Sequence, residues 1–149
     1  MTKYNEEQQK LLRLAAKKEL IRMETILKDV ETVSLLDSFK AKYNLCETVY
    51  KVVLCKHQEA NKKTVNIEHL CVDMRQVPYA LDFAGYKFEK ELLNNLFGSK
   101  SKKGTTVKKL RDKVTHGLDQ KAIAEIKRRK EELFGYMDSF LDAMKNFND

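Results

Sequence analysis

Hydrophobic residues recur at steps of three and four along most of this chain, the spacing that places them on one face of an α-helix. In the first long segment, about residues 5–31, the repeating positions are Leu12, Ala16, Leu20, Met23, Leu27 and Val30. The next segment continues the pattern at Leu36, Phe39, Tyr43, Cys46, Tyr50 and Val53. Ser34 and Asp37 resemble a capping box at its start. We expect both stripes to be buried in the core.

The middle of the chain predicts shorter elements. Residues 59–66 are polar and indicate a loop, and residues 67–96 have a helical pattern that is broken near Pro78 or Gly85. Residues 98–105 are rich in Gly, Ser and Lys and indicate a flexible basic loop. A helix over about 106–116 would then place three apolar residues on one face: Val107, Leu110 and Val114.

The last helix is expected over about residues 120–147, with Gly117 as the left-handed residue that ends the helix before it and Asp119 as its own N-cap. Its apolar seam has heptad-like spacing and is interrupted only at Lys130. The seam consists of Ile123, Ile126, Leu133, Met137, Phe140, Met144 and Phe147. We expect this seam to serve both the core and a second subunit.

These patterns predict one all-α domain over residues 1–149, an up-and-down bundle of five or six helices. Five glycines and one proline leave too few turn signals for a sandwich or barrel. The longest apolar run, Val52–Cys55, is far shorter than the roughly 20 residues that span a bilayer, and residues 1–10 lack a signal-peptide core. Three widely spaced cysteines indicate reduced thiols. We therefore expect a cytoplasmic protein without a membrane segment.

The charge is concentrated in one window. The chain has 29 basic and 22 acidic residues, a net charge of +7. Residues 98–113 contribute seven basic side chains against Asp112 alone: Lys100, Lys102, Lys103, Lys108, Lys109, Arg111 and Lys113. Such a cluster is typical either of a solvated loop or of a surface that binds a polyanion such as RNA or DNA.

A metal site is not expected. Cys55 with His57, and His69 with Cys71, are ligand types that zinc accepts. Residues two apart on a helix point about 200° apart, however, so neither pair would hold one ion from a helical segment. We predict no metal and no cofactor.

The segment from Leu110 to Gly117 differs from the rest, because it carries Arg111 and His116 five positions apart inside the basic window. On an ideal helix the two side chains diverge by about 140°. We expect the helix to end or distort near Gly117, so that both side chains reach one substrate.

This segment resembles the hallmark of the HEPN superfamily (higher eukaryote and prokaryote nucleotide-binding domains). In that family an Arg is followed four to six residues later by a His, and a polar residue, most often Asn, comes directly after the Arg. Here the matching residues are Arg111, Asp112 and His116, and the pair His116-Gly117 also fits the common form. The resemblance in residue identity covers about residues 110–118, while an all-α architecture of this length fits the whole chain.

The resemblance implies a metal-independent endoribonuclease from a toxin–antitoxin, phage-defence or RNA-processing system. Arg111 would stabilise the phosphate, His116 would transfer protons, and Asp112 would orient either of them. Because one histidine rarely serves as both acid and base, the resemblance also implies a homodimer in which two motifs face each other. The lysines of the basic window would bind RNA: Lys100, Lys102, Lys103, Lys108, Lys109 and Lys113. An antitoxin or another operon partner protein would be a further binding partner.

Two alternatives remain open. The first is a catalytically silent HEPN-type module that binds nucleotide, RNA or a partner protein. The second is a basic helical bundle unrelated to the family, for which Arg111 and His116 are expected to lie apart on the surface.

Overall fold

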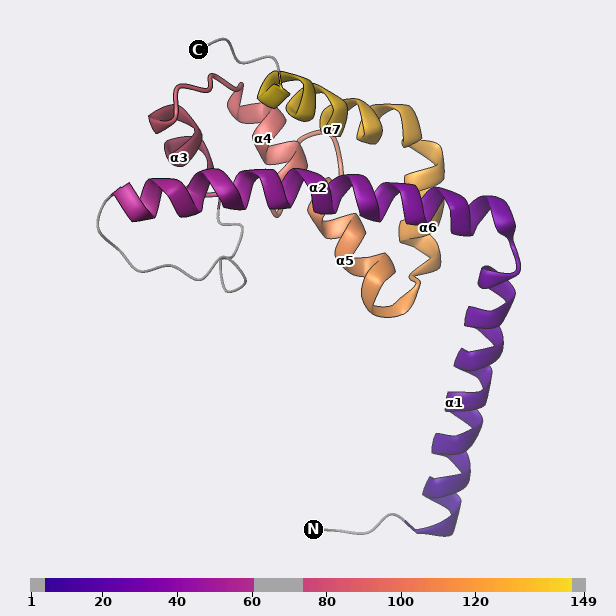
Figure 1. Cartoon of the computed structure of the whole chain (residues 1–149). Helices are drawn as coiled ribbons and strands as arrows, with labels where there is room; N and C mark the ends of the chain where they lie inside the picture. The colour runs from indigo at the N-terminus through magenta and orange to yellow at the C-terminus, as the bar shows by residue number, and fades with distance from the viewer. Residues whose placement is uncertain (1–4, 61–73, 146–149) are drawn as a thin grey trace.

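The computed structural model describes residues 5–60 and 74–145, and these residues form an all-α bundle (Figure 1). The fold-class prediction is therefore confirmed. The described ranges contain seven helices, rather than five or six, because the last predicted helix is divided and α3 and α4 are separate. They are α1 (Glu6–Leu27), α2 (Val30–Ala60), α3 (Val77–Phe83), α4 (Lys90–Phe97), α5 (Val107–Gly117), α6 (Gln120–Arg128) and α7 (Lys130–Lys145).

Helix α2 is the element on which the bundle is assembled, and it contacts α1, α3, α5, α6 and α7. It runs across the molecule in Figure 1 with the later helices gathered along it. The predicted stripe is buried at Leu36, Phe39, Tyr43, Cys46 and Tyr50, and Leu54 continues it instead of the half-buried Val53. Within the described part of the chain, no helix has an apolar stretch sufficient to cross a membrane.

Aromatic rings join α2 to the short helix α4. The Phe97 ring lies 6.1 Å from Tyr43 and 5.6 Å from Tyr50, centroid to centroid. It also packs edge-on against Phe140 of α7 at 5.3 Å. All four side chains are fully buried. Edge-to-face and tilted ring pairs of this kind stabilise a core beyond the apolar area that they bury.

The start of α2 differs from the prediction. Asp29, not Ser34, caps the helix: its carboxylate accepts hydrogen bonds from the Thr32 backbone N–H at 3.2 Å and from Thr32 Oγ1 at 2.6 Å. These hydrogen bonds hold the pKa of Asp29 below its ordinary value. Ser34 lies exposed inside the helix. A carboxylate satisfies the open N–H groups one turn earlier than Ser34 would, so the helix begins at Val30.

The expected last helix is broken into α6 and α7 at Arg129, which is buried, whereas Lys130 is exposed. Its seam residues Ile123, Ile126, Leu133, Met137 and Phe140 are buried in the core of the same chain. The prediction that this seam is shared with a second subunit is therefore wrong, because the chain covers it with its own helices. Phe147 lies outside the described residues.

The expected burial of the first stripe is also wrong. Helix α1 has no buried residue, and Figure 1 shows it running away from the bundle. Of the ten large hydrophobic side chains that are exposed in the described residues, six lie on α1: Leu11, Leu12, Leu14, Leu20, Ile21 and Leu27. Near the C-terminal end of α1, Ile26 packs against the core. The buried face of α2 is already covered by the later helices, so the bundle has no inward face left to receive α1.

Replacing Phe97 with Ala should lower the free energy of unfolding by about 3–5 kcal/mol, because the substitution leaves a cavity among three other buried rings. Urea denaturation followed by circular dichroism measures the change. The matched control is Tyr79→Ala, since the Tyr79 side chain is 67% exposed. Equal losses in the two variants would contradict the proposed role of the Phe97 cluster.

Candidate functional site

The predicted site residues lie on α5, and the sequence explains why this helix forms and how it is oriented. Thr106 caps its start by accepting a hydrogen bond from the Lys109 backbone N–H at 3.3 Å, and it donates one to the Gly98 carbonyl at 2.6 Å. Val107, Leu110 and Val114 are buried as expected. The face of α5 that carries these three residues is therefore fixed in the core. Of the rest of the helix surface, one side lies against α2 and the other is exposed.

Arg111 lies in the middle of α5 and faces α2. Its Nη2 is 3.2 Å from Glu47 Oε2, and its Nε is 3.1 Å from Asp112 Oδ1, although Nε makes no hydrogen bond in that geometry. Its guanidinium stacks 4.6 Å above the Tyr43 ring. Glu47 also pairs with Lys51 at 2.8 Å. Two carboxylates therefore neutralise Arg111, whose side chain is 22% exposed.

Tyr43 adds a neutral surface beneath Arg111. Burial raises the pKa of its hydroxyl, and the nearby Glu47 carboxylate raises the pKa further. Arg111 lowers this pKa, but the net shift is upward. The phenol therefore stays protonated at neutral pH and holds the guanidinium through its ring face.

His116 lies exposed in the last turn of α5, which continues to Gly117. Leu118, not Gly117 as predicted, adopts the left-handed conformation, with φ of 49°. Arg22 of α1 donates hydrogen bonds to the carbonyls of Gly117 at 2.6 Å and Leu118 at 2.8 Å, and its guanidinium is held by Glu19. Because these bonds satisfy carbonyls at the helix end, they offset the cost of a left-handed leucine.

The helix ends at Gly117, as expected, but it is regular from Arg111 to His116, so this ending does not bring the two side chains together. Five residues on a regular helix rotate the side chains by about 140°, so Arg111 faces α2 while His116 faces outward. One chain therefore does not present both side chains to one phosphate. This divergence is what the hypothesis of a bundle unrelated to HEPN expects, and a ribonuclease would need a second copy to combine the two side chains.

His116 shares its helix face with lysines. Lys109, Lys113 and His116 are spaced by four and three residues and are all exposed, so they form one outward stripe on α5. The loop before α5 adds further exposed lysines, namely Lys100, Lys102 and Lys103. We name this set, the stripe and the loop lysines together, the basic face. Lys108 is half-buried and does not belong to it.

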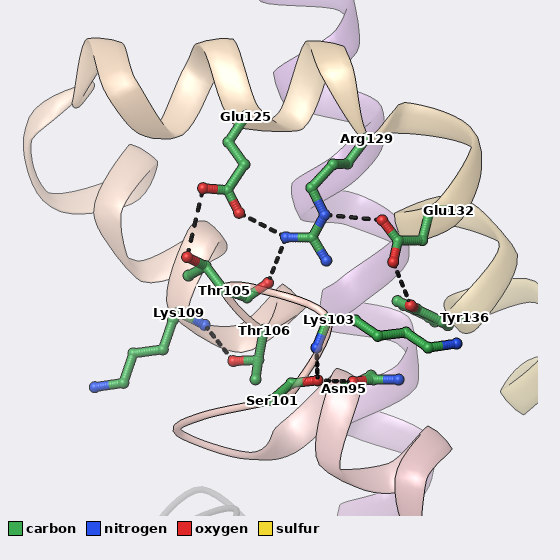
Figure 2. A network of polar contacts seen from close by, with 10 residues as sticks. All are labelled: Asn95, Ser101, Lys103, Thr105, Thr106, Lys109, Glu125, Arg129, Glu132 and Tyr136. Carbon is green, nitrogen blue, oxygen red and sulfur yellow. Dashed lines mark hydrogen bonds and ion pairs between the residues drawn. The ribbon is translucent and has the colours of Figure 1, made fainter.

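The basic loop is tied to the bundle by a polar network around Arg129 (Figure 2). Arg129 Nη1 donates hydrogen bonds to the Thr105 carbonyl at 2.8 Å and to Glu125 Oε2 at 2.5 Å. Its Nε donates to Glu132 Oε2 at 2.8 Å. Gly104 has φ of +119°, and a Cβ there would lie 3.1 Å from Arg129 Nη1. The loop therefore closes directly over the guanidinium.

Further contacts hold the other end of this loop. The Asn94 amide donates to the Lys100 carbonyl at 2.7 Å, and the Lys103 backbone N–H donates to Ser101 Oγ at 3.2 Å. Ser101 Oγ also bonds to the Asn95 side chain. These contacts give the loop more internal structure than the expected flexible linker, while its lysine side chains stay exposed.

Ionisation in the network follows from these contacts. Burial alone would lower the pKa of Arg129, but the hydrogen bonds that it donates to Glu132 and Glu125 outweigh burial, and the net shift is upward. Arg129 and then the Tyr136 hydroxyl lower the pKa of Glu132. Burial, followed by Glu132, raises the pKa of Tyr136 to about 12. All these groups therefore keep their neutral-pH charge states.

Three residues that position the site were not predicted from the sequence: Arg22, Glu47 and Arg129. The available signal for Arg129 was a charged residue at a position that fits the spacing of the apolar seam, next to Lys130.

Among the described residues, no cluster of three or more His, Cys, Asp or Glu side chains is placed to bind a metal ion. His69 and Cys71 lie outside them. Comparisons with protein-family models, with curated proteins and with solved structures find no match to this chain.

Replacing Arg129 with Met should lower the free energy of unfolding by about 2 kcal/mol. The substitution removes three charge-assisted or carbonyl hydrogen bonds, but Glu125 and Glu132 are 23% and 35% exposed and regain hydration. Urea denaturation measures the loss, with Arg128→Met, an exposed neighbour, as the control.

The depressed pKa of Glu132 means that the ion pair of Arg129 and Glu132 stabilises the fold above the ordinary glutamate pKa of about 4.3. The difference between wild type and Arg129→Met should therefore shrink as the pH falls below that value, and a pH-independent difference would contradict the ion-pair explanation.

Proposed function

We propose that this chain binds RNA on the basic face and, as a homodimer, cleaves it by a HEPN-type, metal-independent reaction. The observation that supports the proposal is the position of His116 on the same exposed helix face as Lys109 and Lys113, beside the tethered lysine loop. An RNA backbone drawn to these lysines passes next to an exposed imidazole. An imidazole can accept a proton as a base and donate one as an acid in the neutral pH range.

The proposed reaction uses the RNA 2′-hydroxyl as the nucleophile. His116 takes the 2′-hydroxyl proton while that oxygen attacks the phosphorus, and the bond from phosphorus to the 5′-oxygen breaks. The leaving 5′-oxygen takes a proton from a water molecule, and the resulting hydroxide is neutralised by the proton that His116 took up, while the partner copy supplies the Arg111 at this phosphate. The products are a 2′,3′-cyclic phosphate and a 5′-hydroxyl, so DNA, which lacks the nucleophile, is not cleaved.

Arg111 would stabilise the negative charge that develops on the phosphate oxygens, since a guanidinium offers a planar fork of donors. Glu47, Asp112 and the Tyr43 ring hold this fork in place. Because Arg111 and His116 diverge on one helix, the proposal assigns one phosphodiester to the His116 of one copy and the Arg111 of the other.

The resemblance suggests a cytoplasmic setting in a toxin–antitoxin, phage-defence or RNA-processing system, with an antitoxin or another operon partner protein.

A second candidate function is supported by one observation. The charge of Arg111 is already balanced by Glu47 and Asp112 within the chain. A guanidinium engaged in this way favours the catalytically silent module, in which the basic face binds RNA and Arg111 only fastens α5 to α2. Both candidate functions include RNA binding on the basic face, but only the first includes RNA cleavage.

Cleavage is tested by incubating the chain with RNA in EDTA and comparing wild type with His116→Ala. We expect the variant to lose a hundredfold to ten-thousandfold in rate, because it lacks the group that transfers the proton. Thr115→Ala, an exposed neighbour in the same turn, is the control. For Arg111 the informative variant is Arg111→Lys, because Arg111→Ala would also remove one of the two cations that pair with the half-buried Glu47. Equal rates for His116→Ala and wild type would leave only the silent module.

Binding is tested by replacing Lys100, Lys102 and Lys103 with Gln. The triple variant should bind RNA more weakly and with a flatter dependence of affinity on salt, because each lost phosphate contact releases one counterion fewer. The control removes the same charge elsewhere, at the exposed Lys56, Lys87 and Lys90. Fluorescence anisotropy with labelled RNA at several salt concentrations measures both slopes. An unchanged slope in the loop variant would remove the loop from the RNA-binding surface.

A further inference from the structure

Two uncharged helical surfaces are left uncovered by this chain. The first is the face of α1 formed by Leu12, Ala16, Leu20, Met23 and Leu27, whose leucines are 53%, 57% and 55% exposed. The second is a strip along α2 on the side away from the bundle, which we name the outer strip. It consists of Ser38, Ala41, Leu45, Thr48, Val52 and Cys55, with Leu45 50% and Val52 45% exposed. Both repeat at steps of three and four, so each forms a continuous line along its helix.

An exposed apolar line on α1 needs a cover. This 22-residue helix has no buried residue, so it gains little packing energy, although packing of an amphipathic face provides most of the stability of helices in proteins. Its C-terminal end is held, because Arg22 bonds to the end of α5 and Ile26 meets the core. The remainder projects away from the bundle, as Figure 1 shows.

The two lines complement each other. At a rise of 1.5 Å per residue, the line on α1 extends over about 23 Å and the outer strip over about 26 Å. The α1 line consists mainly of bulky Leu and Met, whereas Ser38, Ala41 and Thr48 leave space along the outer strip for such side chains. Neither line contains a charged residue that pairing would strip of water.

We propose that a second copy of this chain covers both lines at once, with α1 of each copy lying along the outer strip of its partner. Helices α1 and α2 of one chain run in clearly different directions (Figure 1), so a two-fold axis places each α1 beside the other α2 and closes the assembly. Two contacts of about 23 Å, each about 10 Å wide, bury on the order of 900 Å² over both copies, close to the lower bound of about 1,000 Å² for specific interfaces. The proposal concerns this interface alone, and it stands without any RNA activity.

The oligomeric state of the full chain tests the proposal, and it is independent of RNA cleavage. Sedimentation at tens of micromolar should show a dimer for wild type. Leu20→Glu on α1 and Leu45→Lys on α2 should each raise the dissociation constant by about a hundredfold or more, because each substitution affects both contacts. Leu14→Glu is the control, since Leu14 is 49% exposed on the opposite side of α1 and should leave the dimer intact. Circular dichroism verifies that each variant keeps its helical content.

Mixing the two disrupted variants gives the sharpest outcome. A dimer of Leu20→Glu with Leu45→Lys contains one native contact and one in which the new glutamate faces the new lysine, so mixing should restore dimerisation. If mixing does not restore the dimer, the proposed exchange of α1 helices between the two copies is overturned. It is also overturned if Leu14→Glu weakens the dimer as much as Leu20→Glu does. A monomeric wild type whose α1 amides resist hydrogen exchange would show α1 folded onto its own α2, and it would overturn the proposal as well.

Discussion

The contact between α4 and α2 through Phe97 is the constraint on which the rest of the molecule depends. Its ring meets Tyr43 and Tyr50 on one side and Phe140 of α7 on another, so one side chain joins three helices. The chain leaves α4 directly into the basic loop and then into α5. Fixing Phe97 therefore fixes where the loop begins, and Tyr43, held in the same cluster, provides the ring on which Arg111 stacks. The core and the candidate site share these aromatic residues.

Periodicity predicted the helices where the apolar stripe had one possible partner. The stripe of α2, except Val53, and the three apolar residues of α5 are buried as expected, because each faces the core that the described helices form. Periodicity failed for α1, since the spacing shows that a helix has an apolar face but does not specify what covers it. Local capping chemistry was similarly ambiguous at the start of α2, where Asp29 and Ser34 both offered acceptors and the earlier one caps the helix.

The site was predicted in part. The sequence located the cationic window and the exposed His116, because both are properties of a short segment. It did not give the partners of Arg111 and Arg129, since Glu47 is 64 positions from Arg111 in sequence and meets it only after α2 and α5 pack. It also led us to expect that Arg111 and His116 reach one substrate, whereas the regular helix between them directs the two side chains to different sides. Long-range ion pairs depend on packing, and a single sequence does not encode them visibly.

Gly104 limits the substitutions that the basic loop can accept. Its left-handed backbone and the guanidinium beneath it exclude a side chain, so this position tolerates almost no substitution without displacing Arg129. The neighbouring lysines project outward, and Lys103 reaches a carboxylate only at 3.8 Å, from Glu91. Substitution of these exposed lysines can therefore change the charge of the loop one residue at a time with almost no change in the free energy of unfolding. The side-chain charge of this loop can therefore vary while its backbone path is inherited unchanged.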